Sequence, residues 1–339
     1  MLLDKIYELG YTKEDVEKFS NRFYLRNYNR EKMYQKILDT YSTFIKIGYK
    51  HEVIIHMTKV CSGIFIFDGE LIREKINNLI DLGYSNAEVM KMTIIFPALF
   101  TMSVENVKQR MTGMRKLGFS EEDILVMVKR IPTIISHSVD YIKSKIDYMI
   151  SLGYSLKRVL KMMKNSPSLI EYNTIIIDKK ISGMLDLGFS RDAVIKMTST
   201  FSALFGYSID NMKNKINELI LLGYDKKDVL NMLEKAPSIF GLSMDNIVEK
   251  KEFYDSIGIG NVPLVCRSAF IQGLDLLYAR YMFYKSIGID LTMSNYLILF
   301  SNQERFIKKY GLSNKELIKR FNYSEYLNNK ELNVRKKEC

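Results

Sequence analysis

The apolar residues of this chain recur at helical spacing in pairs of short segments. In residues 103–117 they fall on one face of a helix: Val107, Met111, Met114 and Leu117. A second segment after a glycine shows similar spacing: Ile124, Met127 and Val128. The pattern predicts two amphipathic helices that bury their apolar faces against neighbouring elements.

The residues between these segments mark where each helix begins and ends. Ser103 and Ser120 can each accept a hydrogen bond from an unpaired amide, so both are expected to be N-caps. Gly118 accepts a left-handed backbone at no steric cost and ends the first helix. Pro132 has no amide hydrogen and stops the second helix. The unit is therefore helix, turn, helix and a short turn at residues 132–135, for which a 3₁₀ conformation is one option.

This unit returns at a fixed interval. Its glycine recurs every 35 residues, at Gly48, Gly83, Gly118, Gly153, Gly188, Gly223 and Gly258. A period of this length is typical of stacked helical units that share one continuous core. The sequence therefore predicts an all-α fold without sheet, a superhelical α-solenoid of about seven to eight 35-residue repeats.

Three further columns follow the same period. A proline stands in the turn at Pro97, Pro132, Pro167 and Pro237, with Ser202 in the remaining place, where we expect a softer turn and an unchanged fold. A methionine column is expected to fill the core rather than to form a binding surface: Met57, Met92, Met127, Met162, Met197 and Met232. The Tyr or Phe after each glycine is expected to anchor one repeat on the next, with stacking on nucleic-acid bases as the alternative.

The ends of the chain depart from the period, because the terminal units of a solenoid have a face toward solvent. We predict N-terminal capping helices in residues 1–47 and regular repeats in residues 48–258. Degenerate repeats, a C-terminal cap and a basic tail are expected in residues 259–339. Residues 301–339 hold ten Lys or Arg against five Asp or Glu.

Composition narrows the class of partner. The net charge is +11 and the pI is near 9.2, which favours nucleic acid first and an acidic protein or membrane surface second. Cys61, Cys266 and Cys339 are scattered and odd in number, as expected of reduced thiols. No apolar run reaches the ~18 residues of a membrane span, and no leader is visible. We expect a cytoplasmic protein, or an organellar one if the chain is already processed.

One column of charge is more regular than composition explains. From Gly83 to Gly288, the residue eight before each repeat glycine is a cation: Lys75, Arg110, Lys145, Lys180, Lys215, Lys250 and Arg280. The rule fails at Thr40, before Gly48. At about 100° per residue, Arg110 falls inside the apolar face of its helix. Its stem is therefore expected to lie along the core while its charged end reaches one edge.

Two interpretations of this column remain open. In one, the cation bonds free carbonyls at a helix end or a carboxylate of the next repeat. The candidate carboxylate column is interrupted, which argues against a dedicated ion pair: Glu88, Asp123, Arg158, Ala193 and Asp228. In the other, the cations follow the phosphates of a nucleic acid.

A second, less regular cation column stands ten residues before the glycine: Arg73, Lys108, Lys143 and Lys213. It lapses at Asp178 and Val248, as expected of an exposed row. We take the residues of both columns as candidate nucleic-acid-binding residues.

Residues 117–155 resemble the repeat of the mitochondrial transcription termination factor (mTERF) family. The shared features are the Leu-Gly-Phe-Ser opening, the Pro before a Leu/Ile pair, the Ser cap and a Lys ahead of the next Leu-Gly. Residues 279–288 resemble the family's Pro-Arg…Gly segment, with Ala279 in place of Pro, and residues 303–310 resemble its terminal phrase. The resemblance implies a left-handed solenoid whose concave basic side holds nucleic acid, often duplex DNA.

Residues that catalysis would need are scarce. The chain has three histidines, and His51 and His56 are five apart on different helix faces, so they cannot share a zinc ion. We therefore expect no enzyme, no cofactor and no metal. The charge and the family resemblance instead imply a monomer that binds double-stranded DNA or, alternatively, RNA, and regulates transcription. A protein-interaction scaffold is the competing function, and it would present an apolar or mixed groove instead of gathered cations.

Overall fold

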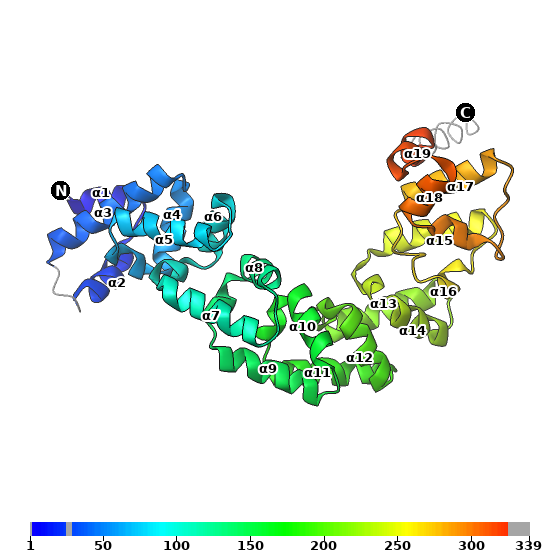
Figure 1. The fold of residues 1–339 in the computed structure, drawn as a ribbon, viewed down its shortest axis with the longest axis horizontal. Coiled ribbons are helices and arrows are strands. Elements are labelled where there is room, and N and C mark those ends of the chain that lie inside the picture. The colour runs from blue at the N-terminus through cyan, green and yellow to red at the C-terminus, as the bar shows by residue number, and fades with distance from the viewer. Residues whose placement is uncertain (1, 25–28, 325–339) are drawn as a thin grey trace. The chain divides into compact units, whose positions relative to one another are not determined.

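The structure, a computed structural model, describes residues 2–24 and 29–324, and these residues form helices and turns without any strand (Figure 1). The chain divides into two compact units, residues 1–174 and 175–339. The predicted all-α repeat architecture is confirmed, whereas the domain boundaries at residues 47 and 258 stay predictions. The predicted basic tail lies outside the described residues.

The repeats of residues 69–241 each contain a long first helix, a shorter second helix and a 3₁₀ turn, and the units before and after them keep part of this pattern. The first helices are α5 (Gly69–Asp81), α7 (Val104–Lys116), α9 (Val139–Ser151), α11 (Thr174–Asp186), α13 (Ile209–Leu221), α15 (Met244–Ser256) and α17 (Leu274–Ser286). The second helices are α4 (His51–Val60), α6 (Asn86–Ile95), α8 (Glu121–Arg130), α10 (Leu156–Asn165), α12 (Arg191–Thr200), α14 (Lys226–Lys235) and α16 (Val262–Val265). The 3₁₀ turns are η1 (Ser62–Ile66), η2 (Pro97–Thr101), η3 (Pro132–Ser136), η4 (Pro167–Ile170), η5 (Ser202–Gly206), η6 (Pro237–Gly241) and η7 (Tyr296–Phe300).

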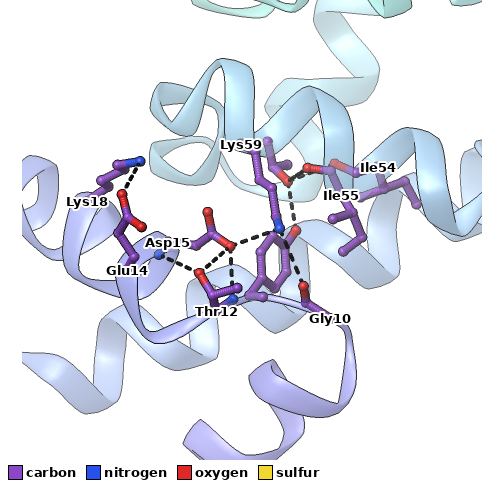
Figure 2. Close-up of polar contacts among 10 residues, drawn as sticks. Gly10, Thr12, Glu14, Asp15, Lys18, Ile54, Ile55 and Lys59 are labelled. Atoms are coloured by element: carbon purple, nitrogen blue, oxygen red, sulfur yellow. Dashed lines mark hydrogen bonds and ion pairs between the residues drawn. The ribbon is translucent and has the colours of Figure 1, made fainter.

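The remaining helices stand at the two ends of the described chain. The N-terminal ones are α1 (Leu2–Glu8), α2 (Lys13–Tyr24) and α3 (Arg30–Ile47), and the C-terminal ones are α18 (Gln303–Tyr310) and α19 (Asn314–Arg320). Polar contacts link the N-terminal helices to the first repeat. Lys59 of α4 reaches the carboxylate of Asp15 at 2.9 Å and the carbonyl of Gly10 at 3.4 Å (Figure 2).

The period of the glycine has two physical causes. At Gly118 the backbone has φ of +105°, a region that other residues rarely adopt. A side chain would also collide with the next repeat, since a Cβ built on Gly118 would lie 2.9 Å from a methyl carbon of Leu160. Gly83 faces Leu125 in the same way, at 3.3 Å. The glycine therefore sets the turn, and at Gly83 and Gly118 it also leaves room for a side chain of the next repeat, whereas a Cβ on Gly48 or Gly223 would meet nothing within 4 Å.

From α4 to α14, the turn after each second helix is a 3₁₀ helix whether or not it begins with proline. Phe96, before Pro97, has φ −132° and ψ 78°, and Phe201, before Ser202, has φ −136° and ψ 77°. The expectation that Ser202 leaves the fold unchanged is confirmed.

The methionine and aromatic columns form the core between repeats, as predicted. All six methionines of the column are buried. The Tyr or Phe that follows the repeat glycine is also buried. Some of the tyrosine hydroxyls bond a side chain of the next repeat. Tyr49 bonds the Thr93 hydroxyl, 44 residues further on, at 2.7 Å. Tyr84 has no partner for its buried hydroxyl, and the residue at the equivalent place is the apolar Val128.

Replacing Tyr84 with Phe should stabilise the protein, because it removes a buried hydroxyl that forms no hydrogen bond. We expect the free energy of unfolding to rise by about 1 kcal/mol in urea denaturation. Tyr49→Phe is the matched control and should lower it by about 1 kcal/mol, since a satisfied bond is lost. Equal losses in the two variants would contradict this account of the aromatic column.

Ser202→Pro should also stabilise the fold. The backbone before Ser202 already has the conformation found before the prolines, so the substitution restricts the unfolded chain without straining the folded one. The expected gain is about 0.4–1 kcal/mol, measured as a rise in Tm. A clear fall in Tm would show that this turn depends on the serine itself.

Candidate functional site

The regular cation column lies where one repeat meets the next. The Nζ atoms of its lysines donate to a backbone carbonyl 27 residues further on: Lys75 to Met102 at 2.9 Å, Lys145 to Tyr172 at 2.8 Å, Lys215 to Leu242 at 2.8 Å, and Lys180 to Tyr207. These carbonyls belong to residues where the chain leaves a 3₁₀ turn and enters the next first helix. The end of a helix leaves carbonyls without intrahelical partners, and the cation supplies one.

The last two cations of the column make the same kind of bond over a shorter separation. Lys250 donates to the carbonyl of Phe270 at 2.6 Å, and Arg280 donates to that of Leu299 at 2.7 Å. Arg110 is the exception: it is partly buried and forms no such bond within the described residues. The carbonyl-bonding role that the sequence left open is therefore present in six of the seven repeats.

These cations are held largely away from water. Lys145 is 7% exposed, Lys250 2% and Arg280 1%. Burial lowers the pKa of Lys75 and of Lys250 below the usual lysine value, because desolvation disfavours the charged amine. Lys145 and Lys250 donate to neutral oxygens, since Lys250 also bonds the side-chain oxygen of Asn246 at 2.7 Å, so these bonds do not cancel the positive charge. Lys215 in addition lies 3.6 Å from the carboxylate of Glu218.

The carboxylates proposed as alternative partners pair with different cations. Glu88 contacts Lys129 of α8 at 2.9 Å, and Asp123 contacts Lys164 of α10. The bond to Lys129, with those to the amide and hydroxyl of Ser85, lowers the pKa of Glu88 to about 2. These ion pairs join successive second helices, so they leave the cation column without a carboxylate partner from this set.

The second cation column is exposed. Arg73, Lys108 and Lys143 lie on α5, α7 and α9, which follow one another in the first unit (Figure 1), and Lys213 lies on α13 in the second. Lys143 contacts Asp147 at 2.6 Å, but both side chains are more than half exposed, so water screens the pair. Arg73 and Lys108 form no ion pair within the described part of the chain. We call Arg73, Lys108 and Lys143 the exposed row.

A hollow of about 260 Å³ opens beside the exposed row. Its lining combines cations, a hydroxyl and an apolar floor: Leu82, Lys108, Met111, Thr112, Arg115, Glu121 and Ile124. One ion pair spans it, with 3.6 Å between Arg115 and Glu121. The hollow therefore offers both positive charge and apolar surface at one point of the row.

Sequence reasoning missed an aromatic feature at the end of the 3₁₀ turns. The residues at this place are all partly exposed: Phe67, Met102, His137, Tyr172, Tyr207 and Leu242. His137 stacks on Tyr141 with ring centroids 4.7 Å apart, and the Nζ atom of Lys145 lies 5.1 Å from the centre of the Tyr141 ring. The sequence could have revealed these residues through their fixed position in the repeat, although the residue types at that position vary.

Other kinds of site find little support in the described residues. No group of three or more His, Cys, Asp or Glu side chains there could hold a metal ion. His51 instead bonds the hydroxyl of Tyr41 at 2.9 Å. No helix in the described ranges is long and apolar enough to cross a membrane. Cys61 and Cys266 are half-buried and form no disulfide with another described residue.

Lys145→Met should destabilise the protein, because it leaves the carbonyl of Tyr172 without its donor. We expect a loss of about 1–3 kcal/mol in the free energy of unfolding. Lys143→Met, two residues away on the exposed side of the same helix, is the control and should change stability by less than about 0.5 kcal/mol. Equal stabilities in denaturant titrations of the two variants would show that the carbonyl bond contributes nothing.

A comparison with models of known protein families finds one that matches this chain. A family model described as mTERF matches the chain in two segments, residues 6–114 and 110–221. Together these segments cover the N-terminal helices and the regular repeats as far as the end of α13. A search of curated protein sequences finds no match.

Proposed function

This chain belongs to the mTERF family, and we propose that it binds nucleic acid through the phosphate backbone without catalysing a reaction. The family is associated with nucleic-acid binding and with the regulation of transcription and translation. The observation that carries the proposal is the exposed row, Arg73, Lys108 and Lys143 on three successive first helices.

The spacing of the row suits a regular charged lattice. Packed helices lie about 8–10 Å apart, so one cation per first helix recurs at about that interval. Duplex DNA presents one phosphate per about 1.7 Å of its axis, and a stiff duplex keeps the spacing constant. We therefore favour double-stranded DNA, with RNA as the alternative, bound by a monomer in a basic groove. Phosphate contacts of this kind position a protein without reading bases.

The regular column is part of the proposal in a supporting role. A lysine amine has three donors, and the carbonyl uses one of them. Lys75 and Lys180 are partly rather than fully buried, so a phosphate approaching that edge would meet their remaining donors. Transcription is the process that we favour. The cytoplasm is the location that we favour, because scattered cysteines in odd number are typical of a reducing compartment.

A protein-interaction scaffold is the second candidate, and one observation favours it. Val60 and Ile95 end their second helices with 63% and 59% of their surface exposed. Exposed apolar side chains at equivalent places in two repeats are a feature that a partner helix could cover.

Replacing Arg73, Lys108 and Lys143 with Gln should weaken binding to all duplex sequences alike. Each lost phosphate contact should reduce the slope of log K against log salt by about 0.9. Lys13, Lys226 and Lys227, exposed cations off the row, give a control with the same change in net charge and should bind like the parent.

The measurement is a salt titration of affinity for duplex DNA, duplex RNA and single strands. Undiminished binding by the folded row variant would rule out the exposed row as the phosphate site. If the parent binds no nucleic acid at low salt, the scaffold function replaces the proposal.

A further inference from the structure

The C-terminal helices carry a concentration of positive charge that the repeats do not explain. Within α18 and α19, six cations are exposed, and we call them the cap patch: Arg305, Lys308, Lys309, Lys315, Lys319 and Arg320. The two acids of these helices are Glu304 and Glu316, and Glu316 is committed to a capping box with Ser313. None of the six cations forms an ion pair within residues 2–24 and 29–324.

Two of the six cations work against the stability of their own helices. Arg305 and Lys315 lie in first turns, where the helix dipole disfavours positive charge. Each also stands four residues before another cation, Lys309 or Lys319, and like charges at that spacing repel. The four cations in the last turns of the two helices favour the dipole. Helix stability therefore does not account for Arg305 and Lys315.

The helices under the patch are firmly packed. Phe306 of α18 and Leu317 of α19 are buried in one core with residues of α17. Arg280 ties the two helices together: its guanidinium bonds the side-chain oxygen of Asn314 at 3.0 Å and lies 5.2 Å from the centre of the Phe306 ring. The six cations therefore lie on helices that the core holds in place.

We infer that the cap patch is a second nucleic-acid contact surface, separate from the exposed row and outside the residues that the family model matches. The inference rests on the proposed function for its class of partner. Two cations of the patch lie beside aromatic rings, with 5.0 Å from the Nζ atom of Lys309 to the Tyr310 ring and 5.4 Å from the guanidinium carbon of Arg320 to the Phe321 ring.

Nucleic acid fits this surface better than a membrane does. A helix that lies in a membrane interface needs a free apolar face. The apolar side of α18 is already occupied, because Phe306 and Tyr310 pack against Phe283 and Tyr284. What remains outside is mainly charge, which suits the phosphates of a nucleic acid.

The test neutralises the four cations that form the repelling pairs, in the full chain: R305Q, K309Q, K315Q and K319Q together. Affinity for duplex DNA or duplex RNA should fall at least about tenfold at 0.1 M salt, with a salt slope smaller by about 0.9 per lost contact. Tm should stay constant or rise, because the repulsion is gone. A control with the same loss of charge, K5Q, K13Q, K226Q and K227Q, should bind like the parent.

Several outcomes would overturn the inference. One is a folded cap variant that binds nucleic acid as tightly as the control. Another is a cap variant that loses binding only to vesicles of phosphatidylserine and phosphatidylcholine, or to polyglutamate. If the exposed-row variant loses affinity and the cap variant does not, the proposed function stands and this inference fails. If the cap variant alone loses affinity, the cap patch stands and the exposed row fails. A parent without affinity for nucleic acid overturns both.

Discussion

The register of the stack depends on a hydrogen bond that recurs from repeat to repeat. A cation near the middle of the first helix reaches the carbonyl at which the chain leaves the next 3₁₀ turn, as Lys145 does with Tyr172. An unpaired buried carbonyl and a desolvated amine are each costly, and the bond removes both costs together. Since the donor is flexible and the carbonyl is fixed, four lysines tolerate varied neighbours while keeping a constant separation of 27 residues, whereas Lys250 and Arg280 bond over 20 and 19 residues.

The close approach of neighbouring repeats supports this bond. Gly118 lets the side chain of Leu160 approach to a distance that a Cβ would forbid, and Ser120 caps the helix that follows. The buried aromatic then crosses into the next repeat, where Tyr49 meets Thr93. Phe119 has no hydroxyl, and the residue 44 positions after it is Met163, an apolar side chain that is also buried. Tyr84 and Tyr224 depart from this matching, because each has a buried hydroxyl without a partner.

The sequence predicted most of the fold, because its signals act locally. A glycine at positive φ, a serine that caps and a proline without an amide hydrogen each fix the backbone within a few residues, and the period then implies the stack. The site was harder to predict, since a charged side chain inside an apolar face indicates only that its end reaches an edge. Whether that end meets a carbonyl, a carboxylate or solvent depends on residues 19 or more positions away. Lys129 and Lys164 were not recognised as the partners of Glu88 and Asp123 for the same reason.

The cations of the chain differ in the groups that they already contact, which are carboxylates for some and backbone carbonyls for others. Lys129 and Lys164 are neutralised by carboxylates, so they add little to the field around the protein. Lys145 and Lys250 each donate to a neutral carbonyl, a bond that engages the amine without cancelling its charge. Lys108 of the exposed row, by contrast, lies in solvent and forms no ion pair within the described part of the chain. The cations that join repeats are thus distinct from the cations that remain accessible to a partner.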